Sequence, residues 1–304
     1  MSNTSLFAAV VLIWGSTWLA ITFQFGEVDP ILSVGLRFTL AAIILGLYCF
    51  LKKLSLRLPS HIHLKMAAAG LCLYALDYTL LYHSQQYIIS AIVAVMSSCM
   101  VYINVLLRRV LLKKPIRREV LIGATCGMVG IGLIFLPEFA KIKADHLLLI
   151  GIVFAFSSFF FAALGNVISE RILDHGTPII QMNFWAMSYG VVFIFAFALY
   201  QGAQWQLPTR PSYYLSMLYL SVFGSVLAFG AYMKLVRQIG SDKSAYVVLV
   251  YPIVALILST LFEGYVWHLE AFIGVLVVLV GNGIAMGKIT IPALGLVKLQ
   301  KHQD

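Results

Sequence analysis

The stretch DPILSVGLRFTLAAIILGLYCFLKK, residues 29–53, begins with an Asp-Pro pair and ends with two lysines. Between these ends, residues 31–51 carry one charged side chain, Arg37. A helix needs about 20 predominantly apolar residues to cross the ~30 Å hydrocarbon core of a bilayer, and proline is favoured in the first helical turn. This stretch therefore predicts a transmembrane helix that begins at Pro30.

The rest of the chain has a similar composition. Of its 304 residues, 61% are hydrophobic and only 11% are charged, and the mean hydropathy is +0.94. Typical soluble domains carry about 25% charged residues, so this chain has too little polar material to cover a water-soluble surface. We therefore predict an all-α, polytopic membrane protein and exclude a soluble fold.

Charged, proline-containing and glycine-rich breaks divide the chain into ten predicted transmembrane helices. They are expected at residues 5–24, 31–51, 64–84, 88–110, 118–136, 147–169, 178–200, 212–236, 243–262 and 269–288. The connections between them are mostly short and leave no room for an extramembrane domain, so the functional site must lie within the membrane.

Lysine and arginine gather in alternate loops of this arrangement. One set of loops and the C-terminal tail hold seventeen of the 21 basic residues, while the other set holds only Lys141, Lys143 and Arg210. Because short cytoplasmic loops are enriched in Lys and Arg, we expect both termini in the cytoplasm. The net charge of +9 then follows from topology and from attraction to anionic lipid, and no nucleic-acid partner is expected.

A weak internal repeat is present at an offset of about 150 residues. Pro30 and Pro178 begin corresponding helices, and Tyr82 falls where Tyr232 does. With five helices per copy, the second copy enters the bilayer from the opposite side, which gives two inverted repeats with a substrate site between them near the midplane. We expect the two repeats and a cytoplasmic tail at residues 1–140, 141–290 and 291–304.

Several segments resemble the paired repeats of a known family. They are VLIWGSTWLAI (11–21), DPILSVGLRFTLAAIIL (29–45), YIISAIVAVMSS (87–98) with GATCGMVGIGLIFL (123–136), and YLSVFGSVLAFGAYMKLVRQIGSDKSAYVVLVYPIVALILS (219–259). In order and spacing they resemble EamA-type transporters of the drug/metabolite transporter superfamily. The resemblance implies a ten-helix carrier of the bacterial inner membrane that moves small metabolites, often amino acids or related compounds, and frequently works as an exporter.

Asp77 lies in the apolar and aromatic segment LYALDYTLLYH, residues 73–83. At ~1.5 Å per residue, it is ~20 Å from the cytoplasmic end of its predicted helix and ~10 Å from the outer end. A charge at that depth costs at least ~2.5–3.5 kcal/mol on insertion scales, so it requires a partner, a watery cavity or a proton. Arg37 is expected at a similar depth. Three roles remain open for Asp77: a structural ion pair with Arg37, a cavity-lining acid that binds a substrate ammonium or a coupling proton, or an acid that snorkels or hydrogen-bonds to the nearby tyrosines.

Aromatic and hydroxyl side chains are expected around Asp77. The helices at 5–24, 88–110 and 243–262 supply them, together with the helix of Asp77 itself. The predicted substrate-binding residues are Asp77, Tyr78, Tyr74, Trp14, Thr17, Trp18, Ser98, Tyr246 and Tyr251. Pro252 is a predicted hinge, because proline leaves a backbone carbonyl free within a helix. For the residues around Asp77, packing between helices is the alternative role.

Glycines recur along the predicted helices 118–136 and 269–288 and indicate faces on which another helix packs closely. They are Gly123, Gly127, Gly130, Gly274 and Gly281. A homodimer contact is an alternative for these faces, and we favour packing within one monomer. Both a monomer and a homodimer remain open as the functional state.

We expect a secondary active transporter that exports a small metabolite, such as an amino acid, by alternating access. Its partners would be the small-molecule substrate and the lipid bilayer, with a coupling proton as a further candidate. A passive or exchange-type facilitator is the alternative. Direct ATP drive is not expected, because the chain contains no G-x-x-x-x-G-K-[ST] loop. An intramembrane enzyme is less favoured, because no H-E-x-x-H or G-x-S-x-G motif is present. The four cysteines form no close pairs, and no metal or other cofactor is expected.

Overall fold

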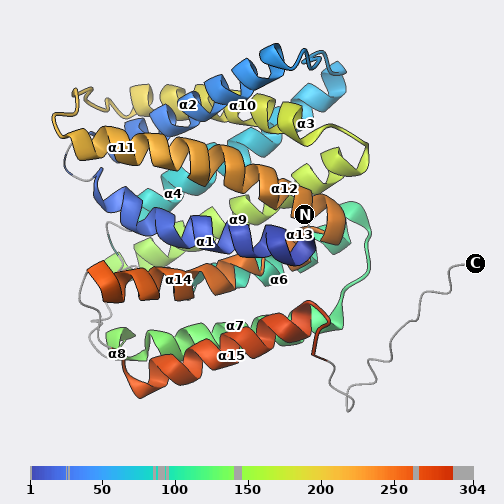
Figure 1. Ribbon diagram of the computed structural model, residues 1–304, viewed down its shortest axis with the longest axis vertical. Coiled ribbons are helices and arrows are strands. Elements are labelled where there is room, and N and C mark those ends of the chain that lie inside the picture. Colours follow the sequence, from blue (N-terminus) through green and yellow to red (C-terminus); the bar gives the residue numbers. More distant parts are fainter. Residues whose placement is uncertain are drawn as a thin grey trace, which may run out of the picture.

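In a computed structural model of the chain, the residues described are 2–24, 26, 28–84, 87, 93, 96–139, 146–262 and 267–289. The regular elements in these ranges are all helices, which run side by side across the molecule (Figure 1). The predicted all-α fold is therefore confirmed for this part of the chain.

The helices of the first half of the chain are α1 (Asn3–Thr22), α2 (Pro30–Leu51), α3 (Ser60–Gly70), η1 (Leu71–Leu76), α4 (Asp77–Ser84), α6 (Cys99–Leu112), α7 (Arg118–Ile134) and α8 (Leu136–Phe139). Those of the second half are α9 (His146–Asp174), α10 (Ile179–Tyr200), α11 (Pro211–Tyr219), η2 (Leu220–Leu227), α12 (Ala228–Ile239), α13 (Ser241–Ser244), α14 (Val247–Phe262) and α15 (Leu269–Ala285). The segments η1 and η2 are π-helical; η1 joins α3 to α4, and η2 joins α11 to α12.

Each of the ten predicted segments contains a helix, with ends that differ by a few residues. Within the described residues, seven helical stretches are long and apolar enough to cross a membrane: Asn3–Thr22, Pro30–Leu51, Ser60–Leu81, His146–Asp174, Ile179–Tyr200, Pro211–Ile239 and Ser241–Phe262. Helices α7 and α15 have 17 residues each. The predicted helix at 88–110 is described as α6 from Cys99 onward, and most of its first half lies outside the described residues.

Helix contacts follow a two-fold pattern that relates the two halves. Helix α2 packs against α10, and α7 packs against α15; the two helices in each pair are counterparts in the predicted repeat. In addition, α1 packs against α14, and the counterparts of these two helices, α9 and α6, pack against each other. Figure 1 shows α7 and α15 side by side at one edge of the bundle. Pairing of counterparts with each other is expected when the halves are related by a two-fold axis in the membrane plane.

The glycines of α7 and α15 show how these two helices align. A Cβ built on Gly130 would lie 2.6 Å from the carbonyl oxygen of Gly274, and one built on Gly281 would lie 2.7 Å from that of Gly123. Gly274 and Gly281 follow Gly123 and Gly130 by 151 residues. Gly130 thus contacts Gly274, which is the repeat counterpart of Gly123, and Gly123 contacts Gly281, which is the counterpart of Gly130. The two helices are therefore antiparallel, and their glycine faces pack within the monomer as predicted.

Replacing Gly130 with alanine should destabilise the protein, because the added Cβ would approach the backbone of α15 at Gly274 and Val278 to less than 3.0 Å. We expect a loss of about 1–3 kcal/mol, typical of overpacking. Gly132 is the matched control, because a Cβ added there has no neighbouring atom within 4 Å. Gly132→Ala should be neutral or raise stability by up to ~1 kcal/mol through helix propensity. Thermal unfolding of both variants in detergent tests this, and equal midpoints would contradict the close packing of α7 on α15.

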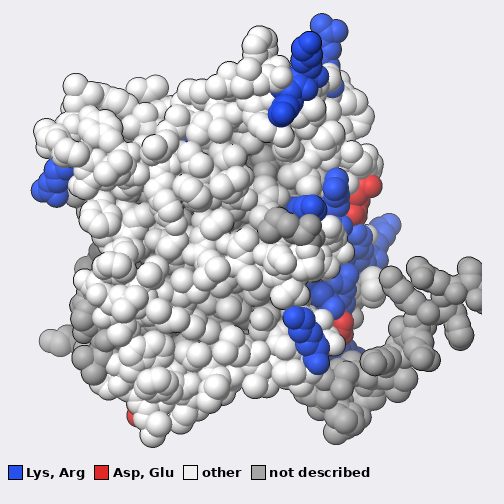
Figure 2. All heavy atoms as spheres, viewed as in Figure 1, with Lys and Arg blue, Asp and Glu red and all other residues white. Residues whose placement is uncertain are grey.

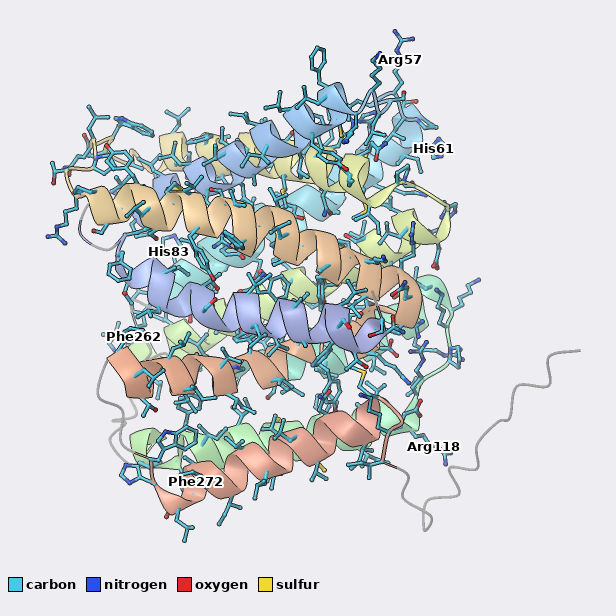
Figure 3. All side chains as sticks on the ribbon, viewed as in Figure 1. Arg57, His61, His83, Arg118, Phe262 and Phe272 are labelled. Atoms are coloured by element: carbon cyan, nitrogen blue, oxygen red, sulfur yellow. The ribbon has the colours of Figure 1, made fainter. Side chains whose placement is uncertain are left out.

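Basic side chains gather at one end of the bundle. Figure 2 shows most of the visible Lys and Arg atoms at the side where Figure 1 marks the N-terminus. Figure 3 places Arg57 and Arg118 there, with His83, Phe262 and Phe272 at the opposite side. We call the end that holds the N-terminus, Arg57 and Arg118 the basic end. Between the two ends the outer surface exposes large apolar side chains such as Leu47, Val192 and Leu276, as expected of helices that face acyl chains.

Candidate functional site

Two π-helical segments occupy equivalent places in the two halves. Segment η1 interrupts the third predicted helix, and η2 interrupts the eighth about 150 residues later. π-helical turns are rare and are found frequently at functional sites. Asp77 directly follows η1, while Gly224 and Ser225 lie within η2. The polar and aromatic groups described below lie on or beside these two segments.

Asp77 is half-buried and bonded to the second half of the protein. Its Oδ1 accepts a hydrogen bond of 2.6 Å from the Ser158 hydroxyl of α9, which packs against α4. No hydrogen bond to Oδ2 occurs among the described residues. One hydroxyl donor only partly replaces the hydration that a carboxylate loses inside a membrane, so Asp77 retains the capacity to bind a cation or a proton.

Arg37 is buried, with 4% of its surface exposed, and is held by η2. Its Nε donates a 2.9 Å hydrogen bond to the Ser225 hydroxyl. The guanidinium carbon lies 5.4 Å from the ring centre of Phe38 and 5.6 Å from that of Tyr78, within the range of cation–π attraction. Within the described residues, Arg37 and Asp77 form no ion pair, and in this conformation each charged group has its own partners.

Six aromatic side chains from both halves form a continuous group beside these charges. The ring centres of Trp14 and Tyr232 are 5.0 Å apart, and those of Tyr74 and Phe229 are 5.1 Å apart. The Trp14 indole Nε1 donates a 3.1 Å hydrogen bond to the carbonyl of Gly224 in η2. We call this group the aromatic cluster; it consists of Trp14, Phe38, Tyr74, Tyr78, Phe229 and Tyr232.

Two hydroxyls in the aromatic cluster are buried without a protein partner. The phenolic oxygens of Tyr74 and Tyr232 make no hydrogen bond with any described residue, although both side chains are at most 2% exposed. A buried hydroxyl that makes no hydrogen bond costs about 1–3 kcal/mol. These two hydroxyls are therefore suited to bind water or a ligand.

A stripe of buried polar side chains on α9 leads from Asp77 toward the basic end. Ser158, Asn166 and Glu170 are all buried on this helix, and Asn166 and Glu170, four residues apart, share a face. The Oδ1 atoms of Asn166 and of Asn104, on the neighbouring helix α6, have no hydrogen-bond partner among the described residues. From Ser158 to Glu170 the rise is ~18 Å. Buried polar atoms of this kind are commonly satisfied by buried water.

At the basic end, five charged side chains form what we call the ionic cluster: Arg108, Lys114, Arg117, Glu170 and Asp242. Glu170 lies 2.9 Å from both Arg108 Nε and Lys114 Nζ, and Asp242 lies 3.4 Å from Arg108 Nη1 and from Arg117 Nη1. Arg108, Glu170 and Asp242 are at most 5% exposed. The cluster joins α6, α9 and α13 and closes this end of the polar stripe.

The first residue of α13, Ser241, completes the coordination of Glu170. The backbone N–H and the hydroxyl of Ser241 donate to Glu170 Oε2 at 2.9 and 2.7 Å. Gly240 has a φ of +89°, and a Cβ there would come within 2.7 Å of the Arg108 guanidinium, so only glycine fits this close approach. Partial burial alone would lower the pKa of Lys114, but hydrogen bonds to Asp174 and Glu170 outweigh it and raise this pKa.

The ionic cluster was not predicted from the sequence. Arg108, Lys114 and Arg117 belong to the predicted cytoplasmic loop charges, and Glu170 and Asp242 had no predicted role. A signal was present, since both acids stand directly before a basic residue at the end of predicted helices where Lys and Arg dominate. Their pairing nevertheless joins residues 62 and 134 positions apart.

Several predicted site residues lie in or beside the aromatic cluster. Tyr78 and Tyr74 belong to it with Trp14, and the Thr17 hydroxyl donates to the Trp14 carbonyl at 2.7 Å. Tyr251 lies on α14, and its backbone carbonyl would be 2.9 Å from a Cβ built on Gly15 of α1.

The remaining predicted residues are placed differently. Ser98 is buried at the start of α6, and Pro252 is buried inside α14. Tyr246 lies apart from the aromatic cluster, because its hydroxyl donates to the carbonyl of Val120 on α7 at 3.2 Å. The side chain of Trp18 lies outside the described residues.

Comparisons with known proteins identify related chains over most of this sequence. The model of the EamA-like transporter family matches residues 2–136 and 149–286. The "Uncharacterized transporter YoaV" of Bacillus subtilis is 26% identical over 82% of this chain and 84% of its own length. The "Uncharacterized inner membrane transporter YedA" of Escherichia coli is 29% identical over 83% of this chain and 80% of its own.

Two further matches bear on function and fold. The "Probable amino-acid metabolite efflux pump" of Salmonella typhimurium is 22% identical over 81% of this chain and 82% of its own length. One solved crystal structure superposes with a TM-score of 0.77 at 16% identity and covers 94% of this chain and 98% of that one. At this level of identity the superposition shows a shared fold.

Proposed function

Because the chain belongs to the EamA-like transporter family, we propose that it is a secondary carrier that exports a small zwitterionic metabolite, such as an amino acid, from the cell by alternating access. We place it in the inner membrane with the basic end in the cytoplasm, since Lys and Arg are enriched on the cytoplasmic side of short loops. The relatives are named as transporters, and one is named as an inner membrane transporter.

The separate arrangement of Asp77 and Arg37 carries this proposal. Asp77 is bonded to Ser158 and Arg37 to Ser225, so neither charge neutralises the other. In the proposed complex the Asp77 carboxylate binds the substrate ammonium, and the Arg37 guanidinium binds the substrate carboxylate. The substrate side chain lies against the aromatic cluster, where apolar groups are favoured and the hydroxyls of Tyr74 and Tyr232 supply polar contacts. The name of the Salmonella relative agrees with this substrate class.

The position of the ionic cluster supports alternating access. In this conformation the contacts of Arg108 with Glu170 and Asp242 close the basic end. Opening toward the cytoplasm requires these contacts to separate, because they join α6 of the first half to α9 and α13 of the second. The buried stripe on α9 then becomes the path between Asp77 and the cytoplasm.

Reconstituted vesicles distinguish active from passive transport. We expect the purified protein to accumulate a radiolabelled amino acid above its equilibrium concentration when a proton gradient is imposed, because a coupled carrier converts that gradient into substrate movement. A protonophore should abolish the accumulation and leave exchange of labelled for unlabelled substrate intact. Equilibration without accumulation under every gradient would instead identify a facilitator, and absence of flux for all amino acids would overturn the substrate class.

A further inference from the structure

A groove separate from the aromatic cluster opens near the basic end between α3, α6 and α9. It has a volume of about 360 Å³ and is lined mainly by apolar side chains, among them Leu64, Leu112 and Val167. Two cationic side chains complete the lining: Lys65 of α3 and Arg171 of α9. Leu64 is 75% exposed, so the groove opens at the outer surface of the helix bundle.

Lys65 and Arg171 have no acidic partner among the described residues. The acids nearest to Arg171 along α9 are Glu170 and Asp174, and both are paired with other cations. Glu170 binds Arg108 and Lys114, and Asp174 binds Lys114 at 2.6 Å. Both positive charges of the groove are therefore available to an external anion.

We propose that this groove binds an anionic phospholipid, with the phosphate between Lys65 and Arg171 and an acyl chain along the apolar walls. Basic pockets between transmembrane helices on the cytoplasmic side are suited to anionic lipid headgroups. The apolar walls favour a lipid over a soluble anion, because they offer hydrophobic burial to the acyl chain and no polar contact to a small ion.

The site connects the two halves of the protein. Helices α3 and α6 belong to the first half and α9 to the second, and α9 contacts both. Arg171 also follows Glu170 of the ionic cluster directly in sequence. A lipid held by Lys65 and Arg171 therefore stabilises the closed arrangement of the basic end. This inference does not depend on which substrate the protein carries.

The test is thermal unfolding of the full-length protein in detergent with added phosphatidylglycerol, or with phosphatidylcholine of the same acyl chains. Phosphatidylglycerol should raise the midpoint by about 3 °C at saturation, and phosphatidylcholine should have little effect. Each positive charge contributes roughly fivefold to binding an anionic lipid, so Lys65→Gln/Arg171→Gln should weaken the apparent affinity by about 25-fold. Lys52→Gln/Arg57→Gln removes two exposed charges outside the groove and should leave the affinity unchanged.

Other outcomes overturn the proposal. Equal stabilisation by the two lipids would mean that no anionic headgroup is recognised, and equal losses in the two double variants would indicate general surface charge. If glycerol phosphate, which has no acyl chains, stabilised the protein as well as phosphatidylglycerol does, and if Lys65→Gln/Arg171→Gln abolished this effect, the groove would be a site for a soluble anion instead. A second variant, Ala68→Phe, keeps both charges and fills the groove; it should also weaken phosphatidylglycerol binding, and unchanged binding would exclude the acyl-chain site.

Discussion

Asp77→Asn is expected to lower substrate transport in reconstituted vesicles by about 10–100-fold. The substitution keeps the size of the side chain and its capacity to accept the hydrogen bond of Ser158, but it removes the charge that we propose to bind the substrate ammonium. A hydrogen bond to a charged group contributes about 1.5–3 kcal/mol, which corresponds to this range. The protein should remain folded, because a neutral side chain is inserted into a membrane more favourably than a charged one.

Two controls separate the role of the charge from that of the local structure. Asp29→Asn makes the same chemical change at the N-cap of α2, where Asp29 accepts a hydrogen bond from the Ile31 N–H at 2.9 Å. Asparagine caps helices as well as aspartate does, so transport should be unchanged. Ser158→Ala removes the hydroxyl donor and leaves the Asp77 charge, and should reduce transport about fivefold through a misplaced carboxylate.

The pH dependence of transport by Asp77→Asn tests whether Asp77 carries the coupling proton. If Asp77 carries that proton, the transport that remains in Asp77→Asn should no longer vary with pH, whereas the Asp29→Asn protein should keep the wild-type profile. Wild-type rates in Asp77→Asn at every pH would reject Asp77 as a binding residue. Reduced transport with an unchanged pH profile would retain substrate binding and place the proton elsewhere.

Glu170→Gln is expected to produce the largest loss of stability, up to about 3–5 kcal/mol, because removing one partner of a buried ion pair leaves charge uncompensated. The carboxylate of Glu170 accepts hydrogen bonds from Arg108, Lys114 and Ser241. After the substitution Arg108 retains only the 3.4 Å contact with Asp242 among its described acidic partners, and Lys114 retains Asp174. Chemical unfolding in detergent measures the difference.

Glu119→Gln provides the matched control for this prediction. Glu119 pairs with Lys243 at 3.6 Å, and its side chain is 28% exposed, so the loss should remain below ~1 kcal/mol. The double variant Arg108→Gln/Glu170→Gln should lose less stability than the sum of the two single variants, because removal of both partners leaves fewer uncompensated charges. Equal losses in Glu170→Gln and Glu119→Gln would contradict the buried, stabilising role of the ionic cluster.

The Glu170→Gln variant also tests whether the ionic cluster controls access to the transport path. Asn104 is buried on α6 and its Oδ1 has no hydrogen-bond partner among the described residues. A cysteine introduced there should react slowly with a water-soluble thiol reagent in the otherwise unchanged protein and faster when Glu170→Gln opens the basic end. Equal rates would mean that the ionic cluster does not control this entrance.

The sequence predicts a depth for Asp77 in the membrane, but it does not predict the partner of this residue. Counting residues along a helix gives depth, because the rise per residue is constant. Arg37 is expected at a depth similar to that of Asp77 and has the opposite charge. The Asp77 carboxylate is nevertheless bonded to Ser158, 81 residues away. Several side chains lie at the same depth as Asp77. The one that contacts it depends on the rotation of each helix about its axis and on the order of the helices in the bundle, and depth gives no information about either.

The π-helical segments were also beyond prediction. Residues 71–76 and 220–227 are apolar stretches within longer apolar helices, and no proline or charged residue within them marks a change in hydrogen bonding. Their equivalent positions in two halves of low sequence similarity became visible only from the backbone. They place Asp77 after η1 and bring Gly224 and Ser225 of η2 to Trp14 and Arg37.

The sequence by itself determined the membrane-spanning, all-helical class, the approximate position of the helices, the gathering of charge at one end and the internal repeat. These properties follow from the thickness and polarity of the bilayer, which act on each segment separately. Only the tertiary structure decided that Glu170 and Asp242 share Arg108, that Asp77 bonds Ser158 and that Tyr246 bonds Val120 of α7. Such pairings depend on lateral packing between distant segments, where shape and close approach select one neighbour among several at the same depth.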